Sequence, residues 1–256
     1  MWSNVVDLRN FYRSKMGRVA RRVIRDHVRT HWADVAGMIV LGIGYATPYL
    51  GAFRDEAARV VSVMPARQGV LRWPANAPNL TTLTDEAELP FPDVSMDRVL
   101  LVHALESSEQ LRPMLREIWR VMADGGRLLA VVPNRSGIWA RLDRTPFGHG
   151  HPYNNSQIST LLRDTMFDPL GGHFGLFMPP SRRRVLIASA PALERIGGRW
   201  FPRLGGVLFI EASKQIYAAA PVAAPARRRR AYAVLPGAAV RETEPARTAG
   251  PPNPGV

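Results

Sequence analysis

The feature that most constrains the fold is a regular alternation of short apolar runs with longer helix-like stretches. Apolar runs this short, bounded by glycine, proline or polar residues, are typical of buried strands. Seven strands are expected, at Met38–Leu41, Val60–Val63, Leu80–Leu83, Val99–Val102, Arg127–Val132, Phe174–Met178 and Val207–Glu211. Helices are expected over residues 5–32, 107–123 and 156–163. The alternation predicts an α/β fold, a mostly parallel seven-stranded sheet with helices on both faces.

A tight glycine loop follows the first expected strand, with the sequence Gly42-Ile43-Gly44-Tyr45-Ala46. Ligands of open parallel sheets bind beyond the carboxyl ends of the strands, at the point where the strand order reverses. We therefore expect a ligand site beside this loop.

The formal net charge of +13 is concentrated at the two ends of the chain. Residues 1–32 carry eight Arg or Lys against two Asp, and residues 221–256 carry six Arg against two Glu. We divide the chain into a basic N-terminal helical extension (1–36), an α/β domain (37–220) and an Arg-, Pro- and Ala-rich tail (221–256). The tail is expected to be disordered. Two interpretations of the basic ends stay open, a solvated surface or a contact with nucleic acid or an anionic surface.

Within the basic extension, Val19, Val23 and Val28 are expected to form an apolar stripe, and Gly17 to break or bend the helix. Ser156 is expected to cap the last helix. The aromatic residues Trp119, Trp139 and Trp200 are expected in the core rather than against a ligand.

Several classes of protein are excluded or disfavoured. The chain has no cysteine, which excludes disulfides and thiolate chemistry. Its six histidines are scattered without a metal-binding motif, so no metal site is expected. It has neither an apolar run of about 18 residues nor an apolar signal core near residue 1, so we expect a cytoplasmic protein without a membrane span.

Further blocks follow the glycine loop in a fixed order. They are Asp85-Glu86-Ala87-Glu88-Leu89-Pro90-Phe91-Pro92-Asp93, Met96-Asp97-Arg98-Val99-Leu100, Leu115-Arg116-Glu117-Ile118-Trp119-Arg120-Val121-Met122 and Gly125-Gly126-Arg127-Leu128. With these blocks, residues 37–220 resemble the class I S-adenosylmethionine-dependent methyltransferases of the type 11-like group. The resemblance implies a Rossmann-like seven-stranded methyltransferase sheet and a methyltransferase-like domain over 37–220.

The same resemblance implies a cofactor site for S-adenosylmethionine. The cofactor would lie over Gly42, Ile43, Gly44, Tyr45 and Ala46, with Met64 near the ribose and Asp85 and Glu86 near the adenine. His103 and Glu106 follow the fourth strand, where members of the family often place side chains that face substrate or cofactor. His103 would face the acceptor as a base or as a pocket wall, together with the loop 145–153. The chain departs from the family pattern at three positions, because Gly42, Ala46 and Met64 stand where an acid, a glycine and an acid are usual. Methionine cannot accept hydrogen bonds from two ribose hydroxyls.

Three functions are therefore weighed. The first is methyl transfer from S-adenosylmethionine to an unknown acceptor, with a small molecule favoured. The alternative is a catalytically degenerate methyltransferase-fold protein that binds or regulates through its basic ends. The third is a methyltransferase acting on nucleic acid, which is disfavoured because Val102-His103-Ala104-Leu105 stands where a base-flipping motif of the Asn-Pro-Pro-Tyr type is expected.

Overall fold

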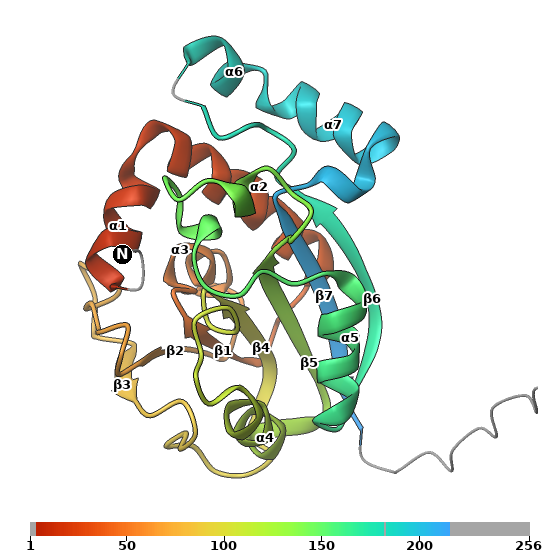
Figure 1. Ribbon diagram of the computed structural model, residues 1–256. Coiled ribbons are helices and arrows are strands. Elements are labelled where there is room, and N and C mark those ends of the chain that lie inside the picture. The colour runs from red at the N-terminus through yellow and green to blue at the C-terminus, as the bar shows by residue number, and fades with distance from the viewer. Residues whose placement is uncertain (1–3, 182, 216–256) are drawn as a thin grey trace, which may run out of the picture. The chain divides into compact units, whose positions relative to one another are not determined.

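Seven strands form one sheet in the order β3-β2-β1-β4-β5-β7-β6 (Figure 1). The computed structural model describes residues 4–181 and 183–215. The strands are β1 Ile39–Gly44, β2 Arg59–Pro65, β3 Thr81–Thr84, β4 Met96–Val102, β5 Met122–Pro133, β6 Phe167–Gly175 and β7 Val207–Lys214. The first five strands pair in parallel, and β7 is antiparallel to both β5 and β6. The predicted α/β, Rossmann-like architecture is confirmed.

Helices cover both faces of the sheet (Figure 1). The helices are α1 Val5–Arg13, α2 Lys15–His31, α3 Thr47–Leu50, α4 Leu111–Val121, α5 Asn155–Asp164, α6 Arg184–Ala188 and α7 Ala190–Trp200. Short 3-10 turns lie at Gly51–Phe53, Trp139–Arg141, Pro146–Gly148 and Pro202–Leu204. Successive residues of a strand point to opposite faces. Val40 accordingly packs in one core with Ile24 of α2, and Leu41 packs in the other with Ile118 of α4.

The strand order reverses at β1 and β4, which lie side by side at the centre of the sheet. Gly44 of β1 is level with Val102 of β4, so the chain leaves both strands at the same edge. The backbone N–H of Tyr45 donates to the Val102 carbonyl at 2.8 Å. The fold therefore brings the glycine loop against the residue that follows β4.

The N-terminal segment folds as two helices, but the break lies at Ser14 rather than at Gly17. The Ser14 side chain caps α2 by accepting from the Gly17 amide at 3.0 Å. Gly17 lies inside α2, where a side chain would overlap the Phe11 carbonyl of α1. The α2 residues that are fully buried are Ala20, Ile24 and Val28, whereas Val19 and Val23 are only partly buried. The predicted stripe is thus shifted, and the arginines of α2 mostly point to solvent.

Three further expectations are corrected. The sixth strand runs over Phe167–Gly175 instead of 174–178, because antiparallel pairing with β7 holds a segment rich in glycine and proline in the sheet. Asn154, not Ser156, caps α5 in a capping box with Gln157. Trp200 is 70% exposed, whereas Trp139 is buried as predicted.

The predicted tail over 221–256 lies outside the described residues. Among the described residues, no helix is both long enough and apolar enough to cross a membrane.

Candidate functional site

His103 occupies a special backbone position directly after β4. Its φ is 52°, in the left-handed region that costs a non-glycine residue about 1 kcal/mol or more. Gly44 faces it across the strand ends with a φ of 80°, and a side chain there would overlap the Val102 carbonyl. The structure therefore directs the His103 ring into the region beside the glycine loop.

Four buried side chains form one hydrogen-bond chain through His103. The Tyr49 hydroxyl donates to the Tyr12 hydroxyl at 2.9 Å, and the Tyr12 hydroxyl lies 2.8 Å from Nε2 of His103. Nδ1 of His103 lies 2.9 Å from Oε1 of Glu106. Because each hydroxyl has one proton and Tyr49 donates to Tyr12, Tyr12 donates to Nε2, which leaves Nδ1 of His103 to donate to the carboxylate. The direction of the chain is therefore Tyr49, Tyr12, His103, Glu106.

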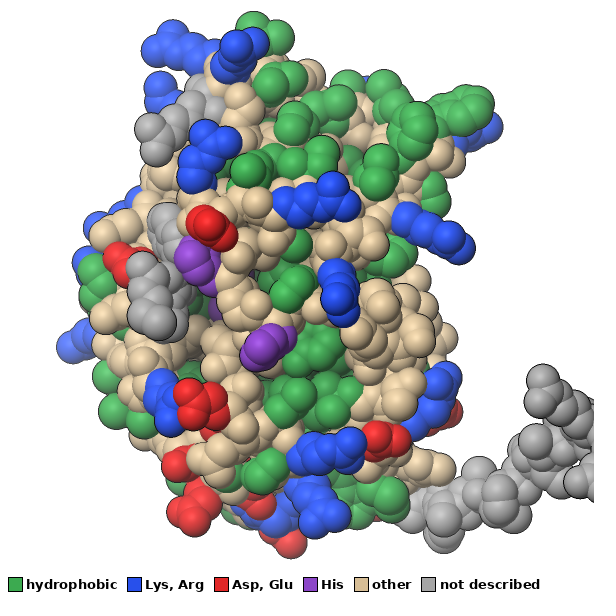
Figure 2. All heavy atoms as spheres, in the orientation of Figure 1, with side chains coloured by type: hydrophobic (Ala, Val, Ile, Leu, Met, Phe, Trp, Pro, Cys, Tyr) green, Lys and Arg blue, Asp and Glu red, His purple; other side chains and the backbone are tan. Residues whose placement is uncertain are grey.

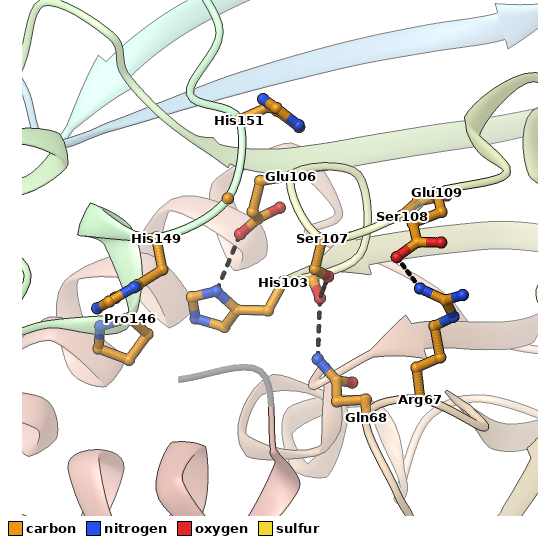
Figure 3. Close-up of a pocket in the computed structure, with 11 residues that line it drawn as sticks. Arg67, Gln68, His103, Glu106, Ser107, Ser108, Glu109, Pro146, His149 and His151 are labelled. Carbon is orange, nitrogen blue, oxygen red and sulfur yellow. Dashed lines mark hydrogen bonds and ion pairs between the residues drawn. The ribbon is translucent and has the colours of Figure 1, made fainter. Parts of the chain in front are cut away.

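A cavity of about 490 Å³ opens beside His103 and Glu106 (Figure 3). It is lined by Arg67, Gln68, His103, Glu106, Ser107, Ser108, Glu109, Pro146, His149, Gly150 and His151. Arg67 and Glu109 form an ion pair at its rim (Figure 3). The predicted loop 145–153 supplies the opposite wall, and the His151 amide donates to the Glu106 carbonyl at 2.8 Å. The volume is that of a small-molecule site.

Two oxygen atoms in the wall of this cavity lack a hydrogen-bond partner among the described residues. They are Oε2 of Glu106 and Oε1 of Gln68, both shielded from solvent. The Gln68 side chain is fixed by its amide nitrogen, which donates to the His103 carbonyl at 3.0 Å. A buried acceptor without a donor costs about 1–3 kcal/mol. The cavity is therefore suited to a ligand that brings O–H or N–H groups.

Part of the predicted acceptor loop is core rather than cavity wall. Phe147 is buried and packs against the rings of His103, Phe11 and Trp139. Tyr153 lies behind Glu106, and its hydroxyl donates to the Leu105 carbonyl at 3.3 Å. Burial and the neighbouring Glu106 carboxylate raise the pKa of Tyr153 to about 12, so the ring stays neutral.

The predicted cofactor residues Gly42, Ile43, Gly44, Tyr45 and Ala46 are all buried, and the first three are the end of β1 rather than a loop after it. Helix α1 covers Tyr45, because the ring of Tyr12 stacks on the ring of Tyr45 with centroids 5.6 Å apart. Burial raises the pKa of Tyr45 to about 12. The loop is thus packed against the chain's own aromatic side chains.

The remaining predicted cofactor residues lie at the ends of β2 and β3. Met64 is fully buried, and its sulfur accepts from the Leu71 amide at 3.4 Å. Asp85 accepts from the Ala87 amide, and Glu86 accepts from the Ser108 hydroxyl and the Gln110 amide. Asp85 and Glu86 line only a small cavity of about 40 Å³.

These residues do not fit S-adenosylmethionine while α1 holds this position. Tyr12 covers the loop over which the cofactor would lie, and the sulfur of Met64 offers no oxygen to the ribose hydroxyls. The structure groups His103 with Glu106, Gln68 and Tyr12, and the last two were not predicted as site residues. The spacing of His103 and Glu106 in the sequence points to their pairing, but no local pattern identifies Tyr12, which lies 91 residues from His103.

Among the described residues, no group of three or more His, Asp or Glu side chains is arranged to hold a metal ion. His27, His31 and His173 do gather, but their ring nitrogens bond to one another.

Comparison with known proteins agrees with the sheet order and the position of the loop. Residues 39–130 match the sequence profile of the family described as "Methyltransferase domain". This match spans about a third of the chain. The chain has a Rossmann-like methyltransferase fold.

The relatives of this methyltransferase-fold protein differ in how much of it they cover. A demethylmenaquinone methyltransferase of Deinococcus radiodurans is 31% identical over 101 residues, which are 38% of this chain and 42% of that relative. The match thus spans less than half of the relative's length. A structure described as a SAM-dependent methyltransferase and possible histamine N-methyltransferase of Thermotoga maritima superimposes with a TM-score of 0.59. It is 14% identical and covers 84% of this chain and 98% of its own. A SAM-dependent methyltransferase of Archaeoglobus fulgidus has a TM-score of 0.55, with 16% identity over 76% and 94% of the two chains. At such identities the likeness concerns the fold.

Proposed function

We propose that the chain transfers a methyl group from S-adenosylmethionine to a small acceptor that carries an O–H or N–H group and binds in the His103–Glu106 cavity. The observation that carries this proposal is the cavity itself, which lies at the strand ends beside the glycine loop and contains an unpartnered carboxylate oxygen. The match of residues 39–130 to a methyltransferase domain supports the reaction type.

The side chains around the cavity supply what such an acceptor needs. When bound, S-adenosylmethionine supplies an electrophilic methyl group. An acceptor O–H or N–H would lose its proton as its bond to the methyl carbon forms and the bond from that carbon to sulfur breaks, and we assign the Glu106 carboxylate of the cavity wall as the group that takes that proton. His103 holds Oε1 of the same carboxylate and so fixes its orientation. We assign Gln68, which also lines the cavity, as a second polar residue that orients the acceptor.

The cofactor requires that α1 first leave the glycine loop. A site that is open in only a fraction of the molecules binds its ligand more weakly by that fraction. The stacking of Tyr12 on Tyr45 therefore predicts weak cofactor binding by the full chain.

A second candidate function has an observation in its favour. If α1 stays on the loop, the chain is a binding protein that uses the cavity without a cofactor. The buried Met64 sulfur in the place of a ribose-binding acid supports this alternative.

Calorimetric titration with S-adenosylmethionine separates the two functions. Tyr12→Ala removes the covering ring and is expected to bind the cofactor about tenfold more tightly than the unaltered chain. Tyr12→Phe is the matched control, because it keeps the ring over Tyr45 and loses only the hydroxyl. Absence of heat from all three proteins at millimolar cofactor would reject the methyltransferase and leave the binding protein.

A further inference from the structure

Helices α6 and α7 and the turn that follows them expose a group of large apolar side chains. Five such side chains are half exposed or more: Val185, Ile196, Trp200, Phe201 and Leu204. Two of them, Val185 at 79% and Trp200 at 70%, are the most exposed large apolar side chains among the described residues. Figure 2 shows hydrophobic side chains gathered over this part of the molecule, at the top of the view, with Arg and Lys side chains beside them. Contiguous apolar surface of this kind marks an interaction site.

The inward side of α7 packs closely on the rest of the protein, so the helix holds its exposed side in a fixed orientation. Gly197 packs so closely on the Phe177 ring that a side chain there would overlap it. The Glu194 carboxylate accepts from the backbone amides of Leu176, Phe177 and Met178. Because these residues face inward, Ile196 and Trp200, which are one turn apart, share the outward face.

The charge on this surface is of one sign. Five exposed arginines border the apolar group: Arg183, Arg184, Arg195, Arg199 and Arg203. Glu194 is the only acidic residue in the segment 183–204. Its carboxylate already accepts hydrogen bonds from the backbone amides of Leu176, Phe177 and Met178. None of the five arginines pairs with a carboxylate among the described residues. The surface thus combines apolar groups with uncompensated positive charge.

We propose that the outer face of α6 and α7 binds an anionic membrane surface. An amphipathic helix with arginines beside tryptophan and aliphatic residues lies in the plane of the lipid headgroups, with its apolar side buried at the boundary with the acyl chains. The indole of Trp200 is suited to that boundary, because its ring is apolar and its N–H is polar. α7 has 11 residues, too few to span a bilayer, so it lies on the membrane. A nucleic acid would use the arginines but would leave Val185, Ile196 and Leu204 in water.

Vesicle binding by the full chain tests this proposal. Vesicles of phosphatidylcholine alone are compared with vesicles of phosphatidylcholine and phosphatidylglycerol in equal parts, by co-sedimentation. The unaltered chain is expected to bind the anionic vesicles preferentially and to retain part of that binding in high salt. Arginine contacts alone, including those of the run Arg227–Arg230 elsewhere in the chain, are screened by salt.

Two pairs of variants identify the surface. Ile196→Ala/Trp200→Ala is expected to weaken binding about tenfold or more in high salt, because it removes the inserted side chains. The matched control is Leu83→Ala/Leu170→Ala, which shortens two half-exposed apolar side chains on β3 and β6 and should leave binding unchanged. Arg195→Glu/Arg199→Glu should abolish the preference for phosphatidylglycerol.

Bromine-labelled acyl chains give a second measurement that does not depend on those variants. They quench tryptophan fluorescence on contact, and the quenching is expected to disappear in Trp200→Phe. Equal vesicle binding by the Ile196→Ala/Trp200→Ala variant and the unaltered chain would overturn the proposal. So would quenching that persists in Trp200→Phe, or a single-stranded RNA that binds with the same dependence on Trp200.

Discussion

Tyr12 links the two parts of the candidate site. Its ring covers Tyr45 of the glycine loop, and its hydroxyl joins Tyr49 to His103. Burial raises the pKa of Tyr12 well above the ordinary value and, together with the neighbouring Tyr49, keeps the hydroxyl protonated. Burial also raises the pKa of Tyr49. Both tyrosine hydroxyls therefore keep the protons that they donate within this hydrogen-bond chain.

That direction leads to a stability prediction for two matched variants. Tyr12→Phe leaves two buried groups unpaired, the Tyr49 hydroxyl and Nε2 of His103, and is expected to cost about 2–4 kcal/mol of unfolding free energy. Tyr49→Phe removes only the hydrogen bond that the Tyr12 hydroxyl accepts. It is expected to cost about 1 kcal/mol of unfolding free energy. Chemical denaturation of the two variants measures the difference. Equal losses would contradict the chain as described.

Glu106 is the residue on which the proposed chemistry depends. Glu106→Gln keeps an oxygen that accepts from Nδ1 of His103, so the fold is expected to be nearly as stable as before. The amide cannot take a proton, so methyl transfer is expected to fall about 10²- to 10⁴-fold. The assay follows formation of S-adenosylhomocysteine with an acceptor found by screening, and circular dichroism checks the fold. A variant that is as active as the unaltered chain would remove Glu106 from the reaction.

At this scale the sequence predicted some residues and missed others for a physical reason. His103 and Glu106 follow a buried strand directly, so their place at the sheet edge could be predicted from the chain order. Tyr12 and Gln68 reach the same point from distant segments, and their contacts depend on how α1 and the chain after β2 pack. Local patterns do not contain that information.

At the scale of elements, the close approach of α1 and α2 controls access to the glycine loop. Ser14 ends α1 and caps α2, and Gly17 lets the two helices meet without a side chain between them. Gly17→Ala inserts a methyl group against the Phe11 carbonyl and should push α1 away. The expected cost is about 1–3 kcal/mol, with tighter binding of S-adenosylmethionine as α1 leaves the loop.

The matched control for Gly17→Ala is Gly51→Ala. Gly51 is in a right-handed helical conformation, and a side chain there would meet no atom within 4 Å. This variant is expected to be neutral or slightly more stable. Thermal unfolding measures both changes, and calorimetry measures the cofactor. Loss of stability without a change in cofactor affinity would show that α1 does not limit binding.

A helix or strand could be predicted from the sequence where its own residues favour that secondary structure. β1, β2 and β4 are short apolar runs, and the expected and observed strands overlap closely. β6 contains Pro169, Gly171 and Gly172, and its pairing with β7 is what makes it a strand. α7 contains two adjacent glycines, and its close packing on Phe177 is a tertiary property. In these cases long-range contacts outweigh local propensity.

At the scale of the whole molecule, three histidines join the basic N-terminal segment to the last two strands. His27 and His31 of α2 both bond to His173 of β6, at 3.0 and 3.2 Å. The ring of Phe209 on β7 stacks on His173 with centroids 4.8 Å apart. Glu194 and Glu211 are the carboxylates that face this group, beside His27 and His31 respectively.

This cluster predicts a loss of stability in mild acid. Burial, and then the neighbouring His27 and His31, lower the pKa of His173 from 6.5 to about 4. The unfolded chain takes up a proton at this residue below pH 6.5, but the folded chain does so only near pH 4. Because the unfolded state binds more protons between these values, the unfolding free energy falls as the pH is lowered through this window. Allowing for the partial exposure of His173, the loss is about 1–2 kcal/mol.

His173→Phe removes the titrating group while keeping a flat ring against Phe209. Urea denaturation between pH 7 and pH 4 should therefore show a smaller loss of stability for this variant than for the unaltered chain. Phe209→Leu serves as the control, because it removes packing without removing a histidine and should lower stability by a similar amount at each pH. Below pH 4.5 a separate loss begins, since hydrogen bonds from His31 and Trp32 lower the pKa of Glu211. If His173→Phe retained the full slope between pH 6.5 and 4.5, the acid sensitivity would have to arise from groups other than His173.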